Sequence, residues 1–160
     1  MPRNVPRRRA GVYVAIVSAR FPHLDPAACS ACRKCEVACV ETHYGLSGLE
    51  PDDAVVLERR RLKIVVSEVP ALNVCNHCAA SPCVTVCPHF ALIRFRDGRV
   101  DLLEDRCTGC GKCIAACPFD AIRRVTDLDI AVKCDGCRDI AGGPACAPAC
   151  PTGALTIVSG

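Results

Sequence analysis

Cysteine is the residue type in this chain that recurs at a spacing able to do chemistry. Sixteen cysteines occur in 160 residues. They fall into four groups of four: Cys29, Cys32, Cys35, Cys39; Cys75, Cys78, Cys83, Cys87; Cys107, Cys110, Cys113, Cys117; and Cys134, Cys137, Cys146, Cys150. The third group reads C-x2-C-x2-C-x3-C-P, in which three close thiolates hold one iron-sulfur cubane and the fourth binds a second. The spacing predicts four 4Fe-4S clusters.

Other uses of clustered cysteines fit less well. A disulfide scaffold does not require a repeated C-x2-C-x2-C step followed by proline. A zinc site needs two cysteine pairs and has no use for a third cysteine three residues on. An enzyme with an open iron needs a cluster with only three cysteine ligands, against which the count of sixteen argues. The chain also lacks a P-loop and a G-x-G-x-x-G fingerprint, so we expect no catalytic residue.

Composition and charge fit a cofactor-filled protein. There is no Trp, and there are only two Tyr and four Phe, so the clusters must occupy much of the interior. Sixteen thiolates and four cores of about +2 each turn the formal charge of +3 into about −5. The basic runs, Arg3 with Arg7 to Arg9 and residues 59–63, lack interleaved aromatic residues. A nucleic-acid partner is therefore not expected.

No segment has the 18 or so apolar residues that a membrane span needs. Arg7 to Arg9 followed by the apolar residues 10–19 imitate a twin-arginine export signal. Val12, Val14 and Ile16 alternate as they would in a strand, which favours a structured segment instead. We expect a cytoplasmic protein.

Turn chemistry predicts the short elements around the cysteine groups. Residues 91–96 and 99–103 flank Asp97-Gly98, a strong hairpin signal, and residues 121–125 and 128–133 form a looser hairpin. Residues 112–117 form a short helical turn that ends at Pro118. The final strand, 154–158, is expected to pair with an opening strand at 12–18, which joins the first and last cysteine groups.

This pairing predicts an α+β fold with two nested ferredoxin-like modules, short β-hairpins and short helices. Residues 11–45 plus 126–160 form the outer module, with cysteine groups one and four. Residues 62–125 form the inner module, with groups two and three. Residues 46–61 are a charged surface linker, and residues 1–10 are a basic extension.

Four motifs carry a family resemblance. They are CSACRKCEVACVETH (29–43), CNHCAASPCVTVCP (75–88), CTGCGKCIAACPFDAI (107–122) and CDGCRDIAGGPACAPACPTGAL (134–155). Over about residues 11–158 the chain resembles the four-cluster iron-sulfur subunits of molybdenum and tungsten pterin oxidoreductases, such as formate dehydrogenases, dimethyl sulfoxide reductases and tungsten aldehyde oxidoreductases. Similar subunits accompany some hydrogenases and carbon monoxide dehydrogenases.

The resemblance implies crossed ligation of the four clusters. The implied ligand sets are Cys29, Cys32, Cys35 and Cys150; Cys75, Cys78, Cys83 and Cys117; Cys107, Cys110, Cys113 and Cys87; and Cys134, Cys137, Cys146 and Cys39. The small size and the run Glu41 to His43 look most like the small subunit of a tungsten aldehyde oxidoreductase.

We therefore expect a non-catalytic electron-transfer subunit, which relays electrons between a pterin-containing catalytic subunit and a flavin subunit or another acceptor. The alternatives are a freely diffusing polyferredoxin and a subunit of a hydrogenase or carbon monoxide dehydrogenase. Stacking of copies into filaments would extend the electron path. His43, His77 and His89 lie beside ligands and either hydrogen-bond sulfur or pack as ordinary residues; Phe90 and Phe119 either shield clusters or pack in the core.

Overall fold

Short strands and short helices, joined by loops and turns, make up the described structure. The computed structural model describes residues 20–159. In chain order the elements are β1 (Arg20–Leu24), α1 (Lys34–Tyr44), α2 (Ala54–Arg59), β2 (Leu62–Val65), β3 (Ala71–Val74), α3 (Pro82–Thr85), β4 (Leu92–Arg94), β5 (Val100–Leu102), the 3-10 turn η1 (Glu104–Arg106), α4 (Lys112–Ala116), β6 (Arg123–Val125), β7 (Ile130–Val132) and β8 (Leu155–Ser159). The strands form four two-stranded antiparallel sheets, β1-β8, β2-β3, β4-β5 and β6-β7. The expected mixture of helices and hairpins is confirmed.

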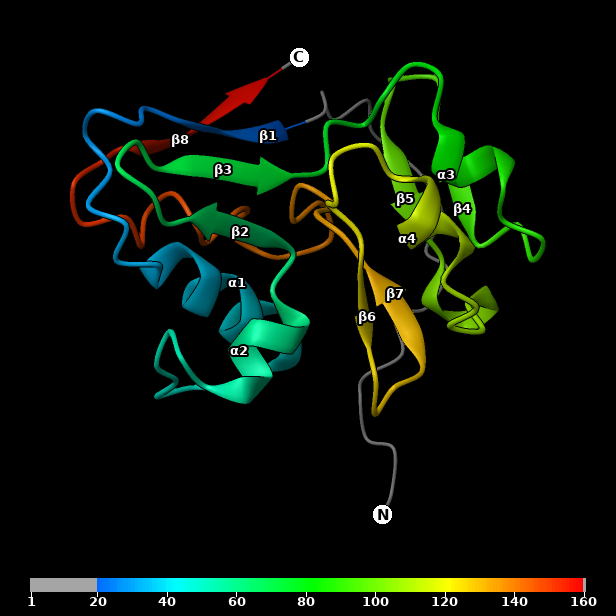
Figure 1. The fold of residues 1–160 in the computed structure, drawn as a ribbon, viewed down its shortest axis with the longest axis horizontal. Coiled ribbons are helices and arrows are strands. Elements are labelled where there is room, and N and C mark those ends of the chain that lie inside the picture. The colour runs from blue at the N-terminus through cyan, green and yellow to red at the C-terminus, as the bar shows by residue number, and fades with distance from the viewer. Residues whose placement is uncertain (1–19, 160) are drawn as a thin grey trace.

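The first and last described strands pair with each other, as Figure 1 shows for β1 and β8. Leu24 lies opposite Leu155, and Pro22 lies opposite Ile157. The expected final strand is confirmed, but its partner is β1 rather than residues 12–18, which lie outside the described residues. Proline lacks a backbone N–H and is tolerated at a sheet edge, and both strands of a two-stranded sheet are edges. This pairing brings the first and fourth cysteine groups together.

The hairpins predicted from turn residues are present. β4 pairs with β5 around Asp97 and Gly98, and β6 pairs with β7 around residues 126–129. The predicted helical turn before Pro118 is α4. These elements surround the second and third cysteine groups.

The segment between the first and second groups is more structured than expected. Residues 46–61 contain α2, whose Val56 packs against Val37 and Val40 of α1. Arg60 and Arg61, which the sequence suggested were surface charges, are buried. The hairpin β2-β3 follows directly. This part of the chain is therefore integrated into the core and is not an exposed connection along its whole length.

Two separate groups of buried residues form around cysteines. One combines Cys35, Cys39, Cys134 and Cys146 with apolar residues of β2, β3 and β8. The other combines Cys113 with apolar residues of β4, β5 and β7. In Figure 1, α1, β1, β2, β3 and β8 lie in one half of the molecule, and α3, α4, β4 and β5 lie in the other. Among the described residues, no helix is long and apolar enough to cross a membrane.

Candidate metal centres

A first cavity joins the first and fourth cysteine groups. Cys29, Cys32 and Cys35 line it together with Cys150. Cys29 and Cys32 lie in the loop before α1, and Cys35 is in its first turn. Cys150 comes from the other end of the sequence and reaches this cavity because β8 pairs with β1.

A second cavity joins the same two groups, but here the fourth group gives three cysteines and the first group gives one. Cys134, Cys137 and Cys146 of the fourth group line it together with Cys39. Cys39 lies one helical turn after Cys35 on α1. The helix thus presents one cysteine to each of the two cavities.

A third cavity joins the second and third groups. Cys107, Cys110 and Cys113 line it together with Cys87. The loop packs closely against the β6-β7 turn at Gly109. A Cβ atom added there would lie 2.5 Å from the carbonyl oxygen of Asp129. The loop of the third group is therefore held against that turn.

The four remaining cysteines are Cys75, Cys78, Cys83 and Cys117. Burial raises the pKa of the Cys83 thiol, and the neighbouring Cys75 and Cys117 raise it further. Cys83 and Cys117 also pack against the same group of buried residues, which includes Cys113. Cys75 also packs against the buried residues around Cys35 and Cys134, so the second group touches the other half of the molecule.

The chemistry of these sites fits an iron-sulfur cluster. A 4Fe-4S cubane takes four cysteine thiolates, and each of the three cavities offers four cysteines. All sixteen cysteines are free of disulfides. Burial raises the pKa of Cys35 and Cys134 to about 12, and that of Cys113 and Cys137 to about 11. Such thiols stay protonated near neutral pH unless a metal replaces the proton.

Backbone N–H groups point at several of the sulfur atoms. The bonds are Ala31 N to Cys29 Sγ (3.4 Å), Ala91 N to Cys87 Sγ (3.3 Å), Ala121 N to Cys117 Sγ (3.5 Å) and Ala131 N to Cys107 Sγ (3.3 Å). Burial acts to raise the pKa of Cys87, but N–H groups from Ala91 and its neighbours outweigh it and lower the pKa. Hydrogen bonds of this kind stabilise negative charge on sulfur and help to set reduction potentials.

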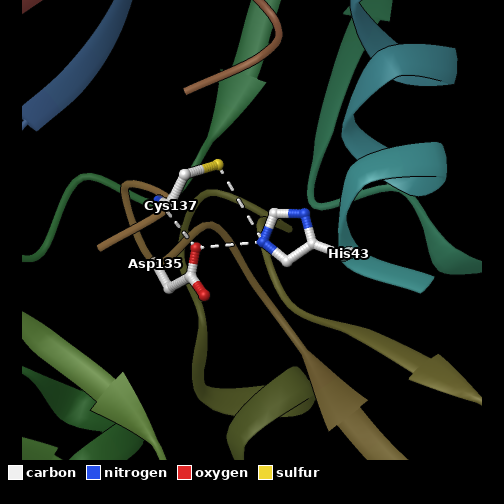
Figure 2. Close-up of side chains that lie close together, drawn as sticks. All are labelled: His43, Asp135 and Cys137. Carbon is white, nitrogen blue, oxygen red and sulfur yellow. Dashed lines mark hydrogen bonds and ion pairs between the residues drawn. The ribbon is translucent and has the colours of Figure 1, made fainter. Parts of the chain in front are cut away.

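His43, Asp135 and Cys137 lie together beside the second cavity (Figure 2). The His43 Nε2 atom is 3.2 Å from Asp135 Oδ1 and 4.0 Å from Cys137 Sγ. Its Nδ1 atom is 2.8 Å from the carbonyl oxygen of Cys39 and 3.8 Å from Cys39 Sγ. The imidazole therefore contacts two cysteines that line one cavity. We assign this trio to the surroundings of that cavity and not to a separate metal site.

A buried ion-pair network lies beside the second cavity, and the sequence did not reveal it. Arg61 donates from Nη1 to Asp135 (3.3 Å) and from Nη2 to Glu104 (3.0 Å). Burial acts to raise the pKa of Asp135, but His43 and Arg61 hold it well below its usual range. The basic run 59–63 was the available signal, but composition does not tell a buried arginine from a solvated one.

The two phenylalanines that follow Cys-Pro pairs lie at the surface. Phe90 is 74% exposed and Phe119 is 46% exposed. The alternative that they pack in the core is therefore wrong, and shielding of a cluster stays a prediction. His77, by contrast, is buried and accepts a hydrogen bond from the backbone of Val100 at 2.9 Å.

Comparison with known families identifies the cysteine pattern. Residues 69–159 match the family model for the 4Fe-4S dicluster domain. The match includes the second, third and fourth cysteine groups and more than half of the chain. The chain belongs to the 4Fe-4S dicluster family. As a dicluster family member it is an iron-sulfur, ferredoxin-like electron transport protein.

Two relatives of this dicluster protein come from Escherichia coli (strain K12). Electron transport protein HydN is 35% identical over 158 residues, which cover 87% of each chain. Formate hydrogenlyase subunit 2 is 36% identical over 176 residues, which cover 87% of this chain and 81% of the relative.

A solved structure resembles the dicluster protein in fold. It is the active site complex BamBC of benzoyl coenzyme A reductase in complex with benzoyl-CoA. The matching chain is 26% identical, with a TM-score of 0.50, and the match covers 87% of this chain and 78% of that one.

Proposed function

We propose that the chain holds four 4Fe-4S clusters by crossed ligation. The sets are Cys29, Cys32, Cys35 and Cys150; Cys75, Cys78, Cys83 and Cys117; Cys107, Cys110, Cys113 and Cys87; and Cys134, Cys137, Cys146 and Cys39. The observation that carries this proposal is that three cavities each combine three cysteines of one group with one from another. The packing of Cys83 and Cys117 against one group of buried residues supports the remaining set.

The two proposed modules follow from the same crossing. Residues 11–45 and 126–160 form the outer one, residues 62–125 the inner one, residues 46–61 connect them and residues 1–10 extend the first. The β1-β8 pairing supports the division, and the two groups of buried residues follow it only in part, because Ala131 of the outer module belongs to the group around Cys113. The hairpin β2-β3 belongs to the inner module by residue number but packs on the outer one. Its Leu62, Ile64 and Val74 contact the buried residues around Cys35 and Cys134.

The proposed role is electron relay between a larger catalytic subunit and an acceptor. When bound, the clusters accept and release single electrons, while the chain's residues hold them, exclude water and supply N–H donors to their sulfur ligands. The name of formate hydrogenlyase subunit 2 and the fold likeness to BamBC support a subunit of a larger oxidoreductase. The proposed partner is a tungsten or molybdenum pterin enzyme, such as an aldehyde oxidoreductase or a formate dehydrogenase, with a flavin subunit as acceptor in the cytoplasm.

The second candidate is a freely diffusing polyferredoxin. The name of HydN, an electron transport protein, supports it. A fixed subunit co-purifies with a large partner at a constant ratio, whereas a free carrier elutes as an isolated chain. Size-exclusion chromatography of the native material separates the two.

Iron and acid-labile sulfide analysis tests the cluster count. Four cubanes require about sixteen irons per chain, and low-temperature EPR of the reduced protein should show interacting 4Fe-4S signals. A fully loaded sample with about eight irons would leave only two clusters and contradict the proposal.

A further inference from the structure

Lys133 is an almost fully buried lysine at the end of β7, immediately before Cys134. Lys133 is 1% exposed. The Nζ atom donates to the backbone carbonyl of Cys134 at 2.9 Å and to that of Val100 on β5. Both partners are neutral acceptors, so they orient the ammonium group without cancelling its charge.

No carboxylate of the described residues forms an ion pair with Lys133. The charge of Lys133 acts on one buried acid, Asp101, but the ion pairs of Asp101 are with two arginines: Arg138 Nη1 lies 2.6 Å and Arg99 Nε 3.5 Å from its Oδ2 atom. A buried, unpaired charge is costly, and such a charge persists where something else of opposite sign lies near it.

The two neighbouring cysteine groups would supply that opposite sign as thiolates that hold clusters. Lys133 Nζ bonds the carbonyl of Cys134, and its other partner, Val100, belongs to the group of buried residues against which Cys83 packs. Cys83 belongs to the second cysteine group and Cys134 to the fourth. The ammonium group therefore lies where the two proposed modules meet.

We propose that Lys133 is the cation that raises the reduction potentials of the two clusters flanking the junction between the modules. These are the clusters assigned to the sets of Cys83 and Cys134, so the inference rests on the proposed four-cluster function. Each reduction adds one negative charge to a cluster. A fixed positive charge in a buried site favours that added electron. Lys133 thereby favours electron passage across the junction.

The test compares matched charge removals in the assembled protein. Lys133→Gln removes the charge but keeps an N–H donor for the two carbonyls, and Lys133→Met removes both. The control is Lys112→Met, because Lys112 also directly precedes a cysteine of a proposed set but is exposed, so solvent screens its charge. Potentiometric titration followed by EPR gives the potentials, and Cys83→Ser and Cys134→Ser assign the two signals.

In Lys133→Gln we expect the reduced-to-oxidised ratio of the two assigned clusters to fall about tenfold at a fixed potential, which is 59 mV for a one-electron couple. The other two clusters, and all clusters of Lys112→Met, should change much less. Unchanged potentials in a fully loaded Lys133→Gln, or equal shifts in the Lys112 control, would overturn the proposal. So would loss of clusters from both neutral variants with retention in Lys133→Arg, since the lysine would then be an assembly element. A wild-type protein with fewer than four clusters would instead defeat the proposed function.

Discussion

The carboxylate of Glu36 on α1 accepts a hydrogen bond from the backbone N–H of Ile64 on β2, at 2.6 Å. Glu36 is fully buried and also pairs with Arg60 Nη1 at 2.7 Å. One side chain thus ties the helix that carries Cys35 and Cys39 to the hairpin that packs beside them. The position of two cysteines depends on a buried ion pair.

Replacement of Glu36 by alanine should destabilise the protein by about 3–5 kcal/mol, because Arg60 is then left buried and unpaired. The apparent Tm, followed by cluster absorbance, should fall by roughly 6–20 °C. Glu68→Ala, in the exposed turn between β2 and β3, is the control and should leave the Tm nearly unchanged. Equal Tm values for the two variants would show that the buried pair does not support the helix.

Gly109→Ala should weaken the loop of the third cysteine group more than Gly111→Ala does. Both glycines have positive φ, 65° and 76°, so alanine costs about 1–2 kcal/mol of backbone strain at either. Only at Gly109 does the new Cβ meet the backbone of Asp129; at Gly111 nothing lies within 4 Å. Iron content and the rate of cluster loss in chelator report the difference, and similar losses from both variants would mean that the contact with Asp129 does not matter.

Cys35→Ser and Cys39→Ser should damage different clusters, although the two residues are one helical turn apart. Crossed ligation makes Cys39→Ser alter the same EPR signal as Cys146→Ser, and Cys35→Ser the same signal as Cys150→Ser. If each group held its own cluster, the Cys35 and Cys39 variants would instead affect one common signal. EPR spectra of the four single variants distinguish these patterns.

Removal of iron should unfold much of the chain, because the buried residues of both halves include cysteines assigned to clusters. We expect hydrogen exchange of β1, β8 and α1 to become fast after treatment with a chelator under reducing conditions. Reconstitution with iron and sulfide should restore protection. Protection that survives complete iron loss would show that the apolar residues alone hold the fold.

The parts of the fold that sequence predicted have strong local signals. Asp97-Gly98 marks the β4-β5 hairpin, and the cysteine spacing marks the cavity-lining residues. β2 and β3 were not predicted, because the turn between them, residues 66–70, has no Gly or Asn to signal it. β1 was not predicted, since Pro22 and His23 interrupt its strand pattern, and the strand predicted at 12–18 lies outside the described residues.

The burial of charged side chains could not be predicted from the sequence for a different reason. Lys133 and Arg61 sit among ordinary charged residues in the chain, and only tertiary packing decides which of them lose contact with water. Lys112 shows the difficulty: like Lys133 it directly precedes a cysteine, yet one lysine is exposed and the other is buried.

The β1-β8 pairing also governs the timing of assembly. Leu24 cannot meet Leu155 until all the residues between them have been synthesised. Cys29, Cys32 and Cys35 must wait equally long for Cys150 to complete their cavity. During translation the first cavity is therefore incomplete when iron is delivered. The third cavity, with Cys87, Cys107, Cys110 and Cys113, can form while β8 is still being synthesised.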